Sequence, residues 1–165
     1  MSEDAFAPIL DEVSTFAASA NDLTGLQDFI VRAIPEHLPY YNWTGFYMID
    51  PKDAGMLVLG PFRGAPTEHV RIPVSQGICG AAVAQNQTVI VDDVNSDPRY
   101  LACSLETRSE IVVPIRANGA VVGEIDIDSH HLAAFSAQDK TFLEECARIV
   151  GRFIERTQAV SSGAK

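Results

Sequence analysis

Residues 103–129 read CSLETRSEIVVPIRANGAVVGEIDIDS and lie at the centre of the fold that we predict for this chain. Two strand-like runs, Glu110 to Arg116 and Ala120 to Asp128, flank the dipeptide Asn118-Gly119. Asn-Gly between such runs is a strong signal for a two-residue β-hairpin loop, because both residues tolerate positive φ. We therefore predict two antiparallel strands joined by a tight turn.

Alternation along the second run sorts its side chains onto two faces of the sheet. Glu124, Asp126 and Asp128 share one face, and the isoleucines between them point to the opposite, buried face. Three carboxylates in a row repel one another, so we expect them to be either exposed to solvent or used for binding. One interpretation is a solvated edge of the hairpin. The other is a functional site, because the thiol of Cys103 lies just upstream in the sequence.

The bulk properties limit the classes of partner. The 165 residues are enough for one domain with a substantial core, so we expect a single domain over residues 1–165. The formal net charge is −10, whereas phosphate binding needs a basic surface, so neither nucleic acid nor an anionic membrane is an expected partner. No apolar run approaches the roughly 18 residues that span a bilayer. The first ten residues are acidic, unlike a signal peptide, and we expect a cytoplasmic location.

The chain has three cysteines, Cys79, Cys103 and Cys146, and an odd number cannot all pair within one chain. Cytosolic thiols stay reduced, so each cysteine is either a buried structural residue or a redox group. Cys146 falls on the apolar face of a helical run and is expected in the core. Cys79 lies near the start of a short helix, where both burial and a role for its thiol stay open. No metal-binding spacing such as CxxC or HExxH occurs, so no metal site or cofactor is expected.

Helical periodicity predicts a first helix over about residues 3–19 and a second one capped by Asn21-Asp22, which Pro35 ends or bends. A long C-terminal helix begins at the capping box Ser136–Asp139. Between these helices lie five or six strands and one small helix. This order predicts an α+β fold, in which an antiparallel sheet of five to six strands carries the N- and C-terminal helices on one face. Loops would cover a pocket on the other face.

Six segments, taken together, connect this pattern to a known family. They are NWTGFY (42–47), LVLGPFRG (57–64), VRIP (70–73), GICGAAVAQNQ (77–87), SEIVVPI (109–115) and GEIDIDS (123–129). Over about residues 10–157 the chain resembles the GAF-domain family of free methionine-(R)-sulfoxide reductases. The resemblance implies a GAF-like fold, reduction of free methionine (R)-sulfoxide by a cysteine thiol, and a thioredoxin-like reductant.

The resemblance also implies roles for individual residues. Cys103 matches the catalytic cysteine, and Cys79 matches a second family cysteine. The acids that would hold the polar end of the substrate match Glu110, Asp126 and Asp128. The aromatic residues of the substrate pocket match Trp43 and Tyr47.

The implied chemistry can be tested against these residue types. Sulfoxide reduction needs a thiolate that attacks sulfur and an acid that protonates the departing oxygen, and it leaves a sulfenic acid that a second thiol reduces. Crowded carboxyl groups raise one another's pKa, so one of them suits the role of proton donor. The acids that stay ionised would bind the amino group of a free amino acid.

Two departures from the family keep other functions open. Family members usually carry a resolving cysteine where this chain has His69, and the block Asp97–Ile111 is more similar to GAF domains of signalling proteins. The second interpretation is therefore a sensor module that binds a small molecule without chemistry. A third is a dimerisation domain, a homodimer in which the first and last helices pair between subunits.

Overall fold

The structure is a computed structural model that describes residues 5–101 and 105–163, apart from the side chains of the last three. Its described residues form a six-stranded sheet in the order β3-β2-β1-β6-β5-β4, and every neighbouring pair of strands is antiparallel. The strands are β1 (Trp43–Asp50), β2 (Asp53–Arg63), β3 (Arg71–Pro73), β4 (Val89–Val91), β5 (Ser109–Ala117) and β6 (Ala120–Ser129).

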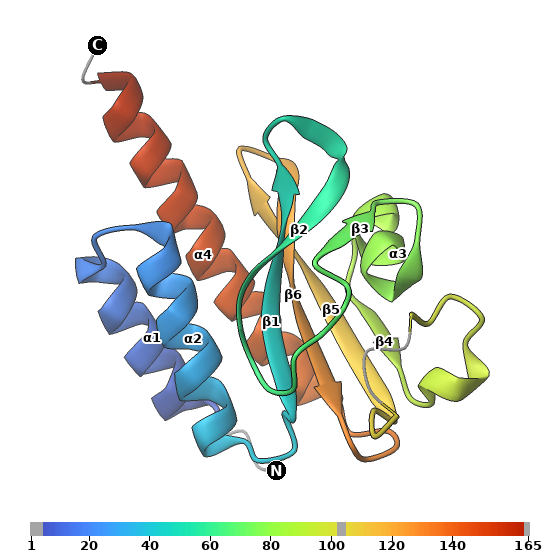
Figure 1. The fold of residues 1–165 in the computed structure, drawn as a ribbon. Helices are drawn as coiled ribbons and strands as arrows, with labels where there is room; N and C mark the ends of the chain where they lie inside the picture. Colours follow the sequence, from blue (N-terminus) through green and yellow to red (C-terminus); the bar gives the residue numbers. More distant parts are fainter. Residues whose placement is uncertain (1–4, 102–104, 164–165) are drawn as a thin grey trace.

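The helices divide between the two faces of this sheet (Figure 1). On one face, α2 (Leu23–His37) and α4 (Ala137–Gly163) pack against the strands, and α1 (Ala7–Ser19) packs on those two helices. On the other face lie α3 (Gly77–Gln85), the short 3₁₀ helix η2 (Val94–Ser96) and the long connections. The predicted α+β arrangement, with the N- and C-terminal helices on one face, is confirmed.

The central hairpin has the predicted turn. Asn118 and Gly119 have φ values of 54° and 80°, the left-handed conformations that a tight two-residue loop requires. The turn pairs Ala117 with Ala120 and Arg116 with Val121, and a bulge between Ile115 and Arg116 shifts the register by one residue, so that Glu110 pairs with Asp128. Because side chains alternate along each strand, this register decides which residues of the two strands meet on each face of the sheet.

The face of the sheet under α2 and α4 carries the main apolar core. Ile125 and Ile127 are fully buried there, together with Phe46 and apolar side chains of all three large helices. Cys146 of α4 belongs to the same core, and burial raises the pKa of its thiol to about 12. The prediction that Cys146 is a core residue is confirmed.

Two helix starts follow the sequence prediction, and one helix end does not. The Asp22 side chain accepts a hydrogen bond from the Gly25 amide (2.8 Å), and the Ser136 and Asp139 side chains each accept one from the other's amide. The helix does not end at Pro35, the first of the two predicted alternatives, because α2 continues to His37. A proline so near the helix terminus removes only one intrahelical bond, and Leu38 again donates to the Ile34 carbonyl (3.0 Å).

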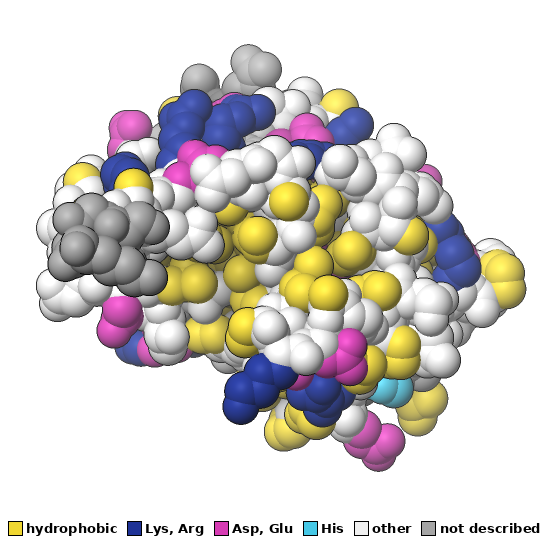
Figure 2. All heavy atoms as spheres, turned by 90° about the horizontal axis from the view of Figure 1, so that it is seen from above, with side chains coloured by type: hydrophobic (Ala, Val, Ile, Leu, Met, Phe, Trp, Pro, Cys, Tyr) yellow, Lys and Arg dark blue, Asp and Glu magenta, His cyan; other side chains and the backbone are white. Residues whose placement is uncertain are grey.

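The outer surface shows no concentration of positive charge in the view of Figure 2. Lys and Arg side chains lie there in separate groups with acidic side chains beside them, and apolar side chains gather between these groups. None of the helices in the described ranges combines the length and hydrophobicity that crossing a bilayer requires.

Candidate functional site

The face of the sheet under α3 carries three rows of side chains across β1, β6 and β5. The cross-strand rows are Trp43–Asp128–Glu110, Gly45–Asp126–Val112 and Tyr47–Glu124–Pro114. Strand alternation and the hairpin register together bring the predicted acids and aromatic residues onto one surface. We refer to the four carboxyl groups of this surface, those of Glu110, Glu124, Asp126 and Asp128, as the acid cluster.

The acid cluster is buried. Glu124 is 0% exposed, Asp126 and Asp128 are each 2% exposed, and Glu110 is 5% exposed. The interpretation of these acids as a solvated edge of the hairpin is therefore wrong. Alternation along a strand shows which residues share a face, but it does not show that a helix some forty residues upstream, α3, packs over that face.

The thiol of Cys79 contacts this cluster directly. Cys79 is the third residue of α3, is 5% exposed, and lies with its Sγ 3.4 Å from Oδ2 of Asp126, to which it donates a hydrogen bond. Burial raises the pKa of the Cys79 thiol well above its ordinary value, and the nearby acids raise it further. These effects outweigh the attraction of a helix N-terminus for a thiolate, so the thiol is neutral at rest.

Several oxygens of the acid cluster have no hydrogen-bond partner. They are Oε1 and Oε2 of Glu124, Oδ1 of Asp126 and Oδ1 of Asp128. None of the ion pairs found within residues 5–101 and 105–160 involves these three acids. Burial raises the pKa of all three, and the neighbouring charge of Asp126 adds to the rise for Glu124 and Asp128. Buried carboxyls without partners reduce the stability of a fold, which indicates that they serve a ligand.

The aromatic residues form one wall beside the cluster. The rings of Trp43 and Tyr47 stack with centroids 6.3 Å apart. A Cβ at Gly45 would lie 2.4 Å from the Trp43 ring, so only glycine lets this ring lie against the strand. The wall is held at both ends, because Trp43 Nε1 donates to the Ala65 carbonyl (3.0 Å) and the Tyr47 hydroxyl donates to the His69 carbonyl (2.7 Å).

A small cavity of about 10 Å³, which is room for about one water molecule, lies between this wall, α3 and the cluster. It is lined by Tyr47, Ile72, Gly77, Ile78, Cys79, Leu101, Glu110 and Asp126. The prediction of a pocket on this face is thus met, although its apolar lining was not identified from the sequence. Strand alternation placed Glu124 on the same face as Asp126 and Asp128, but no role in the site was predicted for it. Cys103 lies outside the described residues, two positions after Leu101 in the sequence.

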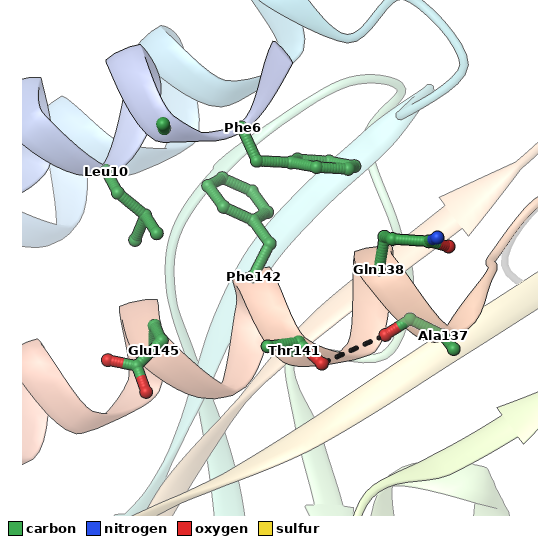
Figure 3. A pocket seen from close by; sticks show the side chains of 8 residues that line it. Phe6, Leu10, Ala137, Gln138, Thr141, Phe142 and Glu145 are labelled. Carbon is green, nitrogen blue, oxygen red and sulfur yellow. Dashed lines mark hydrogen bonds between the residues drawn. The ribbon is translucent and has the colours of Figure 1, made fainter. Parts of the chain in front are cut away.

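A second hollow lies on the opposite side of the molecule, between α1 and α4 (Figure 3). Phe6, Leu10 and Phe142 give it an apolar lining, and the Thr141 hydroxyl is bonded to the Ala137 carbonyl (3.1 Å). Its lining contains one carboxyl group, that of Glu145, and no thiol. The predicted pairing of the first and last helices between subunits would involve these elements, and it stays a prediction.

Replacing Glu124 by glutamine is expected to stabilise the protein above neutral pH. Burial raises the pKa of Glu124 in the folded protein above its unfolded-state value of about 4.3. The stability that the neutral carboxyl contributes is therefore fully present below a pH of about 4.3 and is lost as the pH rises through the folded-state pKa. Glutamine cannot ionise, so Glu124→Gln should gain on the order of 1 kcal/mol or more at a pH of about 8 and little near a pH of about 4. Thermal or urea unfolding at both pH values measures this.

The matched control is Glu36→Gln, a change at an exposed position of α2 that should leave stability within about 0.5 kcal/mol of the wild type. The prediction would be contradicted if Glu124→Gln were less stable than the wild type at a pH of about 8, because the ionised carboxylate would then stabilise the fold.

Comparison with known protein families matches residues 20–155 to the GAF domain. The chain belongs to the GAF-domain family. The expectation of a GAF-like fold is confirmed by a solved structure described as the structure of the GAF domain, which covers 91% of this chain with a TM-score of 0.85 and 34% identity.

Relatives of this GAF domain include named enzymes. It is 43% identical over 112 residues to the free methionine-R-sulfoxide reductase of Saccharomyces cerevisiae and 46% identical over 110 residues to protein YtsP of Bacillus subtilis. Each match covers 67% of this chain but only 62% and 66% of those relatives. The solved structure of the free methionine-R-sulfoxide reductase from Neisseria meningitidis, in complex with its substrate, is 34% identical with a TM-score of 0.89, covering 97% of this chain and 95% of that one.

Proposed function

We propose that this GAF domain reduces free methionine (R)-sulfoxide to methionine, with Cys103 as the attacking thiol. The observation that carries the proposal is the set of buried acids with unpartnered oxygens, Glu124, Asp126 and Asp128, beside a cavity and a thiol. The similarity to reductases, one of them solved with its substrate, supports the reaction. A thiol enzyme of this kind works in a reducing compartment, so we place it in the cytoplasm.

The acid cluster would select a free amino acid. An ammonium group that pairs with Asp126 and Asp128 supplies the positive charge that the site lacks, and it relieves the repulsion between the acids. The side chain of the substrate would lie against Trp43 and Tyr47. A methionine sulfoxide within a polypeptide has no ammonium group to offer, so it would leave the acids unpaired.

The chemistry is an oxygen transfer from the substrate sulfur to a cysteine sulfur. The Cys103 thiolate attacks the sulfoxide sulfur, and a protonated carboxyl of the cluster donates a proton to the oxygen. The oxygen leaves with the cysteine, which gives methionine and a sulfenic acid on Cys103. Burial raises the pKa of Glu124 well above its ordinary value, so this carboxyl is the candidate proton donor, while Asp126 and Asp128 hold the ammonium group.

A second thiol must then restore Cys103. Cys79 is the candidate within the chain: its thiol would attack the sulfenic sulfur, forming a disulfide and releasing water, and a thioredoxin-like dithiol would reduce that disulfide. The raised pKa of Cys79 makes it a weaker first attacker, which leaves that role to Cys103. An external dithiol acting directly on the sulfenic acid is the other route.

A sensor without chemistry is the second candidate function. It is favoured by His69, which stands where the reductases usually carry a resolving cysteine. The Tyr47 hydroxyl contacts the backbone carbonyl of residue 69, so this wall of the pocket forms whichever side chain is present. The same cavity would then bind a small cationic or zwitterionic ligand and leave it unchanged.

The test is an assay that resolves the two epimers. The wild-type protein is incubated with racemic free methionine sulfoxide and dithiothreitol, and both epimers and methionine are quantified over time. We expect the R epimer to disappear with an equal gain of methionine while the S epimer persists. No loss of either epimer would contradict the reductase and leave the sensor.

A further inference from the structure

Three potential metal ligands from three different elements meet at the cavity. They are Cys79 of α3, Glu110 of β5 and Asp126 of β6, all buried, and their donor atoms lie within 4.8 Å of one another. Sequence spacing does not indicate this site, because the three residues are 31 and 16 positions apart and fit no metal-binding motif. The hairpin register and the packing of α3 create it.

The distances suit a zinc-type site. Zinc bonds of about 2.3 Å to sulfur and about 2.0 Å to oxygen at a tetrahedral angle place the two ligand atoms about 3.5 Å apart. The Sγ of Cys79 and Oδ2 of Asp126 are 3.4 Å apart. A carboxylate oxygen of Glu110 lies within 4.8 Å of both atoms. Rotation of this carboxylate would bring it to the metal as the third protein ligand and leave the fourth position open.

A second observation points to a cation at this place. Asp126 lines the cavity, and its Oδ1 is buried and has no hydrogen-bond partner. Oδ1 of Asp128, the next acid on this face of β6, is also buried without a partner. No Lys, Arg or His within the described residues forms an ion pair with either aspartate. Among the residues that the structure describes, the site therefore offers acceptors and negative charge, and no positive group pairs with its two aspartates.

We propose that Cys79, Glu110 and Asp126 form a binding site for a thiophilic divalent cation of the zinc type. Binding displaces the Cys79 thiol proton to solvent and joins the thiolate and two carboxylates to the metal. A thiolate selects zinc or cadmium over magnesium and calcium, which prefer larger sets of oxygen ligands. A second part of this proposal rests on the proposed function. The bound cation occupies the place of the ammonium group of methionine sulfoxide, so zinc acts as a reversible inhibitor of the reductase.

The test uses cadmium ion as a spectroscopic probe for zinc, because cadmium–thiolate bonds give an ultraviolet charge-transfer band. The full chain, reduced with a phosphine and freed of metal, is titrated with cadmium chloride. Cys79→Ser and Glu110→Gln are compared with Cys146→Ser, the matched change of a buried thiol in the apolar core of α4. Thermal melting of each variant verifies that it is folded.

We expect a band that saturates at one cadmium ion per chain in the wild type and in Cys146→Ser. Cys79→Ser should lose the band, and Glu110→Gln should weaken binding by more than about 100-fold, which exceeds the loss expected for a residue that only hydrogen-bonds to a metal ligand. No band in the wild type, or a band that persists in Cys79→Ser, would overturn the proposal. The titration contains no sulfoxide, so its failure is distinct from a failure of the reductase assay.

Discussion

Replacing Asp126 by asparagine is expected to lower kcat/KM for free methionine (R)-sulfoxide by about 100-fold. Loss of a buried charge that pairs with a ligand typically costs about 2–5 kcal/mol, and each 1.4 kcal/mol corresponds to about a factor of ten. Asp126 is at the centre of the cluster, 2% exposed, between Gly45 and Val112 in its row. Steady-state kinetics on the free substrate measures the effect.

The stability of the same variant separates a site residue from a structural one. The folded-state pKa of Asp126 is raised by burial, so the unmodified residue destabilises the fold above the unfolded-state pKa of about 3.9. Asp126→Asn should therefore be at least as stable as the wild type while its activity falls. The control Asp11→Asn, at an exposed position of α1, should change neither quantity. A variant that loses stability and activity together would show that Asp126 is structural.

Replacing Cys103 by serine is expected to abolish the reaction, with a loss of at least about 1,000-fold in kcat. A serine hydroxyl is a far weaker nucleophile than a thiolate and cannot form a sulfenic acid. Methionine formation with excess dithiothreitol measures this, and Cys146→Ser serves as the control that should keep full activity. Activity that survives in Cys103→Ser would move the attacking role to Cys79.

The central hairpin shows how far the sequence reaches for the fold. Asn118-Gly119 and the alternation around it predict β5 and β6, because local turn chemistry and strand pairing agree there. The starts of α2 and α4 are predicted for the same reason, since each cap is a contact between residues three positions apart. The predicted helix end at Pro35 was wrong, because the tertiary packing of α2 outweighs the loss of a single hydrogen bond.

The candidate site was predictable only in part. The strand period placed Asp126 and Asp128 on one face, and the family resemblance supplied Glu110, Trp43 and Tyr47. Their burial, however, depends on α3 and on the cross-strand register, which are contacts between segments far apart in the chain. For that reason, the sequence left both a solvated edge and a functional site open.

The proximity of the thiol to the acids has the same origin. Cys79 and Asp126 are 47 positions apart in the sequence, so the helix that carries the thiol and the strand that carries the acids were interpreted separately. From the sequence, the thiol of Cys79 could either have a lowered pKa at a helix start or be buried. In the structure it is buried, and burial together with the nearby acids raises its pKa. A metal site could not be expected from spacing, because its three ligands lie on one helix and two strands.

The most direct measurement compares free L-methionine (R)-sulfoxide with its N-acetyl derivative as substrates of the wild-type protein. Acetylation converts the ammonium group, which the buried acids are proposed to hold, into a neutral and larger amide. We predict that kcat/KM for the free amino acid is higher by at least about 100-fold, in line with the loss of a buried charge pair. Equal rates for the two compounds would contradict the assignment of the acid cluster as an ammonium site.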